Sequence, residues 1–426
     1  MKKNLCFIIL FSFVLLNAKT WIREYTYQAS EADSKITSRA IALEQVKRLL
    51  LQEIGVYVHS TVLSGEFEAS GEVKDLSAKQ IEIVSAGITK TTIIEENWDG
   101  KTFYMKAEIT ADENDVIKRL DSVIEDKEKT KQLEESRHRT DKALAEIERL
   151  KHQLAQTQDE NEILKIQSQY NDSSNELSAE DWFQKGYNAT EMKDFENAIL
   201  YYQKSIELYP YAEAYYNMGI AYGSKSSYEK AIECYQKSIE LYPFAKAYHN
   251  MGVAYNDKSN YDKAIECYQK SLEINPEDAE TFYNMGISYG NKGNYEKEIE
   301  CYQQAIAIDP DDADAYNNMG LAYGNKGYND KAIECYQKAI AINPDDASTY
   351  NNMGLAYGNK GYNDKAIECF QKAIALDPDD AAAFFNMGIT YHNKGNRERA
   401  FELYKKAARL GLISAQNYLK QNGVSW

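Results

Sequence analysis

The sequence predicts a mainly α-helical protein, in which a solenoid of seven helical hairpins follows a small α+β domain and a helical spacer. The main observation is a repeat period. Five cysteines recur at intervals of 33, 34, 34 and 34 residues, and a fixed period of this size is typical of stacked helical hairpins. A second observation is the charged stretch 121–178, which contains neither Pro nor Gly and is therefore typical of a long helix.

Residues 1–18 have the order of an export signal. Two lysines precede an uninterrupted apolar run from Leu5 to Leu16, and Ala18 supplies the small residue at which cleavage is expected. The run of 12 residues is too short for a membrane span, which needs about 20. The sequence therefore predicts an exported, periplasmic protein with no integral membrane span. A signal retained as an anchor is the alternative.

Residues 19–120 are expected to form a small α+β domain. The segment WIREYTYQAS has the composition of a strand, and TKTTIIEENWDGKTFYMKAEIT reads as two strands about Asp99 and Gly100, a signal for a type I′ hairpin. A helix between them carries an apolar stripe. The stripe consists of Ile36, Ala40, Leu43, Val46, Leu50 and Ile54.

This domain resembles the N-terminal domain of the flagellar assembly protein T family and its relatives among small envelope lipoproteins. The helix that begins with Ser38, Arg39 and Ala40 and the hairpin from Trp98 to Tyr104 carry the resemblance. It implies a location in the cell envelope and no particular activity.

Residues 121–178 are expected to form a helical spacer with a short heptad pattern. One seam position holds Leu133, Thr140, Ile147, Leu154 and Asn161, and its complement holds Ala143, Leu150, Thr157 and Leu164. This favours a homo-oligomer through a coiled coil at 121–178, and a single solvated helix acting as a spacer is the alternative. His138 and His152 fall on the outer face in this register.

The period divides the rest of the chain into seven units and a tail. The units are 179–211, 212–244, 245–278, 279–312, 313–346, 347–380 and 381–414, and the tail is 415–426. In the fifth unit an aromatic, Gly, Tyr, Ala, aromatic, Ala and Pro follow one another as Tyr316, Gly320, Tyr323, Ala332, Tyr336, Ala339 and Pro344. This pattern resembles the tetratricopeptide repeat (TPR) family, which implies an α-solenoid that binds proteins.

Each position of the pattern has a physical reason. Tyr316, Gly320 and Tyr323 share one face of the first helix, where Gly320 lets the second helix approach closely. Pro344 ends the second helix, and the aspartates after it are placed to cap the next helix. In the segment GLISAQNYLKQNG, a capping helix is expected to turn Ile413, Ala415 and Tyr418 back onto the last hairpin.

The recurring cysteines are predicted to fill hairpin cores. They occupy position 23 of their units, counted from the first residue of each unit, where the first and last units have Tyr201 and Leu403. A position that accepts any apolar residue suits a buried cysteine. No CxxC pair or histidine partner accompanies them, so no metal or other cofactor is expected.

Catalysis and nucleic-acid binding have no support in the sequence. Five scattered histidines, no GxSxG motif and no phosphate-binding glycine loop leave nothing to assemble into an active site. The net charge of −17 would repel a phosphate backbone.

A row of asparagines is the candidate binding site. Position 6 of the first helix, on the face opposite the core, is Asn217, Asn250, Asn284, Asn318, Asn352 and Asn386. Position 13 adds Asn291, Asn325, Asn359 and Asn393. Side-chain amides donate and accept hydrogen bonds, so such a row can hold an extended peptide backbone. The row looks like the asparagine ladder of the O-linked N-acetylglucosamine transferases. The alternative is that Asn at position 6 helps the helix start or bridges neighbouring hairpins.

The predicted function is therefore an exported, non-enzymatic adaptor that binds a protein or peptide segment in the concave groove of the repeats. The alternative is a structural component of cell-envelope assembly, in which the N-terminal domain carries the interaction and the repeats act as a spacer. The basic clamp for C-terminal carboxylates is missing. Position 5 is instead Tyr216, His249, Tyr283, Asn317, Asn351 and Phe385.

Overall fold

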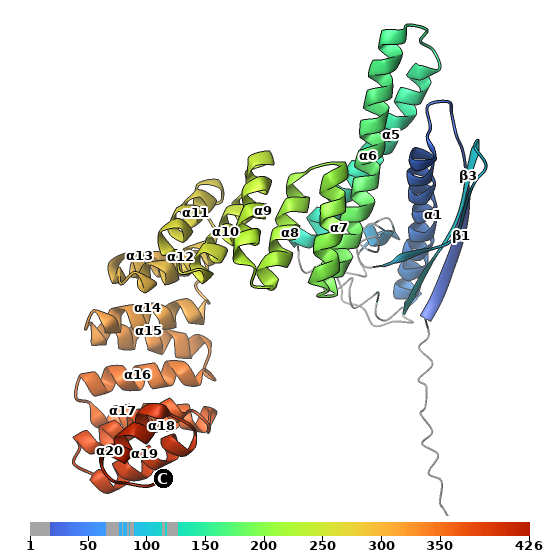
Figure 1. The fold of residues 1–426 in the computed structure, drawn as a ribbon. Coiled ribbons are helices and arrows are strands. Elements are labelled where there is room, and N and C mark those ends of the chain that lie inside the picture. Colours follow the sequence, from blue (N-terminus) through green and yellow to red (C-terminus); the bar gives the residue numbers. More distant parts are fainter. Residues whose placement is uncertain are drawn as a thin grey trace, which may run out of the picture. The chain divides into compact units, whose positions relative to one another are not determined.

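The structure is a computed structural model that describes residues 18–64, 76–78, 80–82, 85, 89–112, 116 and 127–426. The chain forms two compact units, Met1–Ser227 and Tyr228–Trp426, each of which is described by itself (Figure 1). The predicted signal, except for Ala18, lies outside the described residues. No helix in the described part of the chain is long and apolar enough to cross a membrane.

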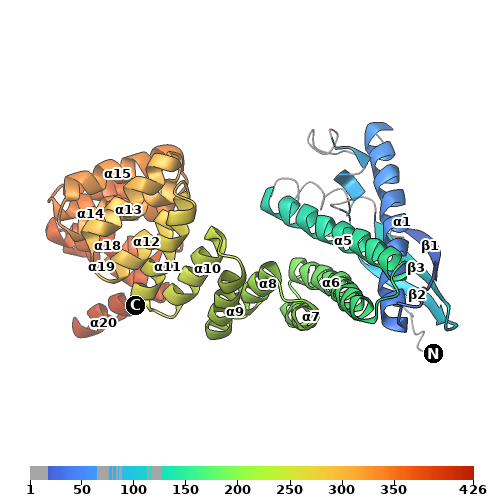
Figure 2. The same ribbon diagram turned by 90° about the horizontal axis from the view of Figure 1, so that it is seen from above.

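The first unit opens with a three-stranded antiparallel sheet. The strands β1 (Ala18–Gln28), β2 (Thr91–Trp98) and β3 (Thr102–Asp112) lie in the order β1-β3-β2. Helix α1 (Lys35–Ser64) packs along one face of the sheet (Figures 1 and 2). The α+β expectation is therefore confirmed.

Two details of this region differ from the sequence prediction. The β2–β3 turn is not type I′, because Gly100, with φ 95°, is its one residue at positive φ, and a type I′ turn needs two. Asp99 instead accepts hydrogen bonds from the backbone N–H groups of Lys101 and Thr102 at 2.8 and 2.6 Å. On α1, Leu43 to Ile54 of the predicted stripe are buried, but Ile36, near the helix start, is 75% exposed.

The expected single helix over 121–178 is wrong, because the chain turns between two helices. Helix α5 (Lys127–Leu154) packs against α6 (Glu160–Glu191), and Asp159 caps the start of α6. The seam residues Leu133, Ile147 and Leu150 of α5 are buried in one core with α1 and the sheet. These side chains pack within the chain, which leaves little of the predicted seam for a second copy; Leu164 on α6 is 70% exposed.

The repeat helices follow the predicted period. In the first unit the end of α6 packs against α7 (Phe195–Leu208), and α8 (Ala212–Ser224) follows. The second unit contains α9 (Tyr228–Leu241), α10 (Ala245–Asp257), α11 (Tyr261–Ile274), α12 (Ala279–Asn291), α13 (Tyr295–Ile308), α14 (Ala313–Asn325), α15 (Asn329–Ile342), α16 (Ala347–Asn359), α17 (Asn363–Leu376), α18 (Ala381–Asn393), α19 (Arg397–Arg409) and α20 (Ile413–Gln421).

Six of the hairpins close on a glycine–aromatic contact. A Cβ atom added to Gly320 of α14 would lie 2.6 Å from the Tyr336 ring of α15. The same contact recurs in five other hairpins. The pairs are Gly186 with Tyr202, Gly252 with Tyr268, Gly286 with Tyr302, Gly354 with Phe370 and Gly388 with Tyr404. The close approach predicted for Gly320 is therefore confirmed.

The helix starts depend on the link length. Asp346 caps α16 by accepting from the backbone N–H groups of Ser348 and Thr349, and Asp278, Asp312 and Asp380 cap α12, α14 and α18. The units that end at 211 and 244 are one residue shorter. Their following helices begin after Tyr211 and Phe244 and have no side-chain cap.

Helix α20 caps the repeats, with one correction to the residues that face back. Ala415 and Leu419 are fully buried, and Tyr418 packs partly buried against the last hairpin. Ile413 was expected to face back but is 69% exposed, because it is the first residue of α20 and lies outside its buried stripe.

Candidate functional site

Three of the position-6 asparagines form hydrogen-bonded rungs between the first helices of successive repeats within the compact unit Tyr228–Trp426. Asn352 Nδ2 donates to Asn317 Oδ1 at 3.1 Å, and Asn386 Nδ2 donates to Asn351 Oδ1 at 3.0 Å. Asn318 Nδ2 donates to the Tyr283 hydroxyl at 2.8 Å. Position 6 of one unit thus bonds position 5 of the unit before, so these amides bridge neighbouring hairpins.

The other members of the row differ from these three. The side chain of Asn284 is half-buried and hydrogen-bonds to no described residue, whereas Asn250 of α10 is half-buried and interacts with another residue. Asn217 belongs to the compact unit Met1–Ser227 and is buried, with 6% of its surface exposed. At position 5 of the third unit, His249 Nδ1 lies 2.6 Å from the Thr281 hydroxyl. Burial lowers the pKa of this histidine, so it is neutral near pH 7.

Two exposed rows accompany the rungs on the same helix face. At position 9, Leu321, Leu355 and Ile389 are 38%, 41% and 40% exposed. At position 13, asparagines are exposed and hydrogen-bond to no described residue. The asparagines are Asn291, Asn325, Asn359 and Asn393. We call the surface made by positions 6, 9 and 13 of α12, α14, α16 and α18 the amide groove.

The apolar row was missed in the sequence analysis, although its signal was present. Position 9 is apolar in every unit from the second to the seventh. The residues are Ile220, Val253, Ile287, Leu321, Leu355 and Ile389. Leu321, Leu355 and Ile389 are exposed, whereas Val253 and Ile287 are half-buried and pack against the hairpin cores. Exposed apolar side chains that recur at one position are typical of a surface that binds another molecule.

The amide groove deepens into an open cavity of about 460 Å³ at α12, α13 and α14. Asn318 and Leu321 of the groove line it, as does Glu298 of α13. Side chains of the groove thus offer amide hydrogen bonds beside apolar contacts. A peptide in extended conformation needs both, one for its backbone and one for alternate side chains.

The recurring cysteines lie in the cores between hairpins, as predicted. All five are buried and free, and Cys335 packs with Ile299, Tyr302 and Met319 of the preceding hairpin and α14. Burial raises the pKa of the Cys267 thiol to about 12 and that of Cys335 to about 11. A buried thiol with a raised pKa is a poor ligand and nucleophile. The described residues contain no cluster of three or more His, Cys, Asp or Glu that could hold a metal ion.

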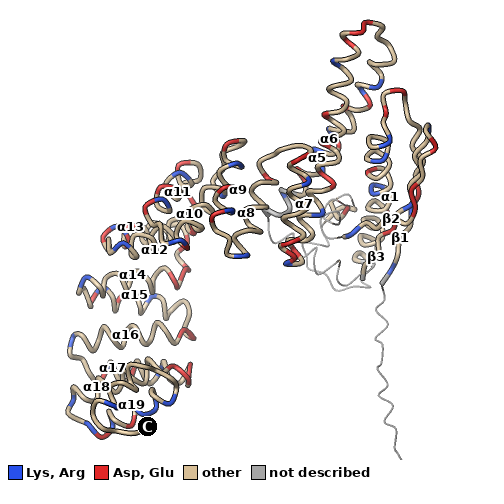
Figure 3. The backbone as a smooth tube through the Cα atoms, in the orientation of Figure 1, with Lys and Arg blue, Asp and Glu red and all other residues tan. Residues whose placement is uncertain are grey.

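A row of ion pairs joins successive units at their loops. From the second unit to the seventh, the lysine at position 14 pairs with the acid at position 18 of the unit before. The pairs are Lys225 with Glu196, Lys258 with Glu229, Lys292 with Asp262, Lys326 with Glu296, Lys360 with Asp330 and Lys394 with Asp364. Basic and acidic residues are accordingly interspersed along the repeat helices from α8 to α19 (Figure 3). Exposed pairs contribute little to stability individually, so the row aligns the units rather than binding a ligand.

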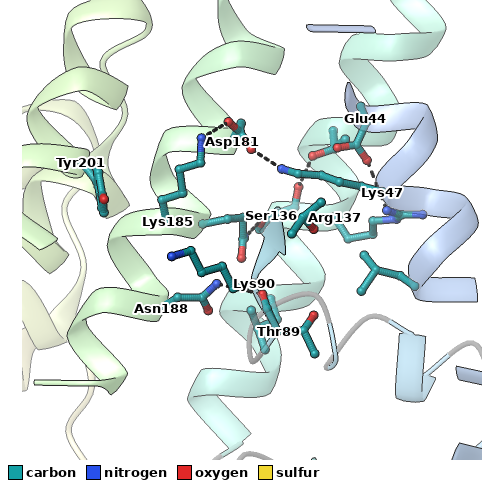
Figure 4. A pocket seen from close by; sticks show the side chains of 15 residues that line it. Glu44, Lys47, Thr89, Lys90, Ser136, Arg137, Asp181, Lys185, Asn188 and Tyr201 are labelled. Carbon is teal, nitrogen blue, oxygen red and sulfur yellow. Dashed lines mark hydrogen bonds and ion pairs between the residues drawn. The ribbon is translucent and has the colours of Figure 1, made fainter. Parts of the chain in front are cut away.

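A second, smaller cavity of about 150 Å³ lies in the first unit between α1, α5 and α6 (Figure 4). Lys47 of α1 pairs with Asp181 of α6, which also accepts from Lys185 at 2.8 Å. Burial opposes the ionisation of Asp181, but these ammonium groups outweigh it and hold the pKa of the carboxyl at about 2. These charges are paired within the chain, so they fasten α6 to α1. Sequence reasoning missed the pair because its members are 134 residues apart.

Several solved structures are similar to part of this chain. MamA is 32% identical, over 39% of this chain and 97% of its own, at a TM-score of 0.37. YrrB, described as a TPR protein with an unusual peptide-binding site, is 26% identical over 45% of this chain and 99% of its own, at a TM-score of 0.38. A MamA fragment from Desulfovibrio magneticus RS-1 is 25% identical over 39% and 94%, at a TM-score of 0.37. No curated protein matches the chain.

A family model covers more than half of the chain. It matches residues 135–421, from within α5 to the end of α20, and leaves the sheet and α1 unassigned. The matched segment contains the complete set of repeat hairpins described above. The chain therefore belongs to the TPR family whose model is described as the C-terminal domain of cilia and flagella-associated protein 70.

Proposed function

We propose that this TPR protein is a non-enzymatic adaptor that holds an extended segment of a partner protein in the amide groove. TPR proteins bind other proteins, and this assigns the general class. The observation that carries the finer proposal is that two exposed rows run side by side along α14, α16 and α18. One row consists of the amides at position 13, and the other of the apolar side chains at position 9.

The rungs at position 6 serve the same surface. Each uses one N–H of an amide that has two, and the side-chain oxygens of Asn318, Asn352 and Asn386 remain available. Because the rungs fix the side-chain orientations, the remaining groups are preorganised for a ligand backbone and lose little freedom on binding.

The experiment is site-specific photo-crosslinking in cells that make the protein. Benzoylphenylalanine is placed at Leu321, Leu355 or Ile389 in the groove. Matched control variants carry it at Ile274, Ile308 or Ile342, which are similarly exposed at the ends of second helices. One partner band that appears from the groove positions and not from the controls is the expected result. A partner crosslinked only from the control positions would contradict the proposal.

We further propose that the adaptor works outside the cytoplasm, in the periplasmic space. The lysine–apolar–small order of residues 1–18 supports this, together with the resemblance of the N-terminal domain to flagellar assembly protein T and small envelope lipoproteins. Cell fractionation of the full chain and of a variant with Ile9 and Leu10 both changed to Asp tests it, because the second chain should remain in the cytoplasm. Equal distribution of the two chains would overturn the location.

One observation favours the alternative, an envelope assembly component that interacts through its N-terminal domain. Helix α1 packs on one face of the sheet, and Ile22 of β1 and Ile94 of β2 are 41% and 47% exposed. Exposed apolar side chains on two edge strands are typical of a protein-binding surface. Crosslinking from Ile22 and Ile94, with no product from the amide groove, would decide for this alternative.

A further inference from the structure

Glu298 departs from the repeat at a position that is otherwise invariant within the chain. Position 20 is a fully buried alanine in the six other units. The alanines are Ala198, Ala231, Ala264, Ala332, Ala366 and Ala400. In the fourth unit it is Glu298, which is 8% exposed. The carboxyl group lies over Gly290, where an added Cβ atom would come within 2.6 Å of Oε1 and 2.8 Å of Oε2. The glutamate therefore fits because the facing residue lacks a side chain.

The carboxyl group has an unsatisfied oxygen. Glu298 Oε2 is buried and has no hydrogen-bond partner among the described residues, and Tyr302 is the side chain that offers the group a hydrogen bond. A buried carboxylate in this condition is costly unless a cation or a further donor reaches it.

The lysines of the neighbouring elements are engaged elsewhere. Lys292 and Lys326 form their ion pairs with Asp262 and Glu296, and Lys297 Nζ lies 5.1 Å from the centre of the Tyr289 ring. The remaining titratable groups that line the cavity are the phenols of Tyr295 and Tyr302. Among the described residues that line this cavity, Glu298 is the acidic side chain, and none of them is basic.

Glu298 also faces the amide groove. The open cavity of about 460 Å³ that it lines is shared with Asn318, Leu321 and Asn325, and a cavity of this size admits a long side chain. We propose that Glu298 recognises the ammonium or guanidinium group of a Lys or Arg side chain of the segment bound in the groove. An incoming cation supplies both the opposite charge and the hydrogen bonds that the buried carboxyl lacks.

This inference rests on the proposed function, since it names the chemistry of one residue in the groove-bound segment. It also makes binding depend on pH. Burial raises the pKa of the Glu298 carboxyl to about 7. A cation bound beside the carboxylate favours ionisation, so binding is accompanied by proton release and should weaken as the pH falls from 8 to 6.

The experiment uses the full chain and two capped eleven-residue peptides composed of Asn, Ser and Leu. The peptides differ only at the central residue, which is Lys in one and norleucine in the matched control. Binding is measured by fluorescence anisotropy at pH 8 and pH 6. At pH 8 we expect the Lys peptide to bind about tenfold more tightly than the norleucine peptide, a ratio typical of one desolvated charge pair. The preference should fall to about twofold or less at pH 6 and in Glu298→Gln.

Glu300→Gln is the control protein, because Glu300 is exposed on the same helix and its change removes the same charge. Glu298→Ala restores the residue of the other units and serves if Glu298→Gln folds poorly. Equal binding of the two peptides, or an unchanged preference in Glu298→Gln, overturns the inference while leaving the groove in place. Failure of both peptides to bind overturns the groove proposal as well.

Discussion

The side-chain amide of Asn352 donates a hydrogen bond to Asn317 Oδ1, 3.1 Å away on the preceding first helix. Asn at position 6 thus has a structural role in three units, because the amides of Asn318, Asn352 and Asn386 each tie two hairpins together. The Asn352 amide has a second N–H and an oxygen that hydrogen-bond to no described residue. Structural and binding roles therefore coexist in one residue, and they can be separated by comparing this row with the position-13 row.

Changing Asn352 and Asn386 to Ala should lower the thermal stability of the protein. Each variant loses an inter-unit hydrogen bond worth roughly 0.5 to 1.5 kcal/mol, so the double variant should melt a few degrees lower in circular dichroism. Asn359→Ala with Asn393→Ala is the matched control, since these exposed amides bond no described residue. An unchanged melting temperature in the first variant would show that the rungs carry no stability.

Gly320→Ala should destabilise the protein, because the new methyl group would meet the Tyr336 ring at 2.6 Å. We expect a loss of about 1 to 3 kcal/mol in urea unfolding, as for other overpacked cores. Gly324→Ala, four residues later in α14, meets nothing within 4 Å and should raise stability by up to about 1 kcal/mol through helix propensity. Equal effects of the two changes on the free energy of unfolding would show that the close approach of the Tyr336 ring does not require glycine at position 320.

The five buried thiols should resist alkylation in the folded protein. With the pKa of Cys267 raised to about 12, the thiolate fraction at pH 8 is negligible, so iodoacetamide should label all five only after urea is added. Mass spectrometry of the labelled protein measures this. Replacing the five by Ala should cost roughly 1 kcal/mol per site and leave the fold intact. Stoichiometric labelling without urea would contradict the core assignment.

Glu298 should make stability fall as the pH rises. The pKa of Glu298 is about 7 in the folded chain and 4.5 in the unfolded chain. The free energy of unfolding is therefore highest below pH 4.5, where the carboxyl is protonated in both states, and it falls as the pH rises through 7. Glu298→Gln should therefore gain melting temperature over the unsubstituted protein at pH 8 and not at pH 5. Glu300→Gln should show no such change in calorimetry, and a parallel pH profile for both would refute the buried-carboxyl description.

Leu150→Asp should unfold the first unit rather than dissociate an oligomer. Leu150 is fully buried in the core that α5 shares with α1 and the sheet, so a carboxylate there should cost several kcal/mol. Leu164→Asp is the control, because that side chain is 70% exposed. Circular dichroism and sedimentation distinguish the outcomes, and a folded monomer made from a folded dimer would restore the coiled-coil prediction.

The sequence by itself determined the repeats. A period of 34 residues with Gly320 and Tyr336 in register specifies a hairpin through contacts within one unit, and copying the unit copies the contacts. The cysteine positions, the aspartate caps and the asparagine row followed from the same local pattern. In the described part of 121–178, the heptad pattern correctly predicts helix over Lys127–Leu154 with one apolar face, but not the turn before Glu160.

Only the tertiary structure decided what those patterns face. Periodicity gives the direction of a side chain on its own helix but not the partner of that face, so the seam of α5 was assigned to a second copy although it packs on α1 and the sheet. The pairing of Lys47 with Asp181 and the unsatisfied oxygen of Glu298 were hidden for the same reason. Each depends on segments that come into contact only in the folded chain. Burial results from these contacts, and it raises the free-energy cost of an unpaired charge.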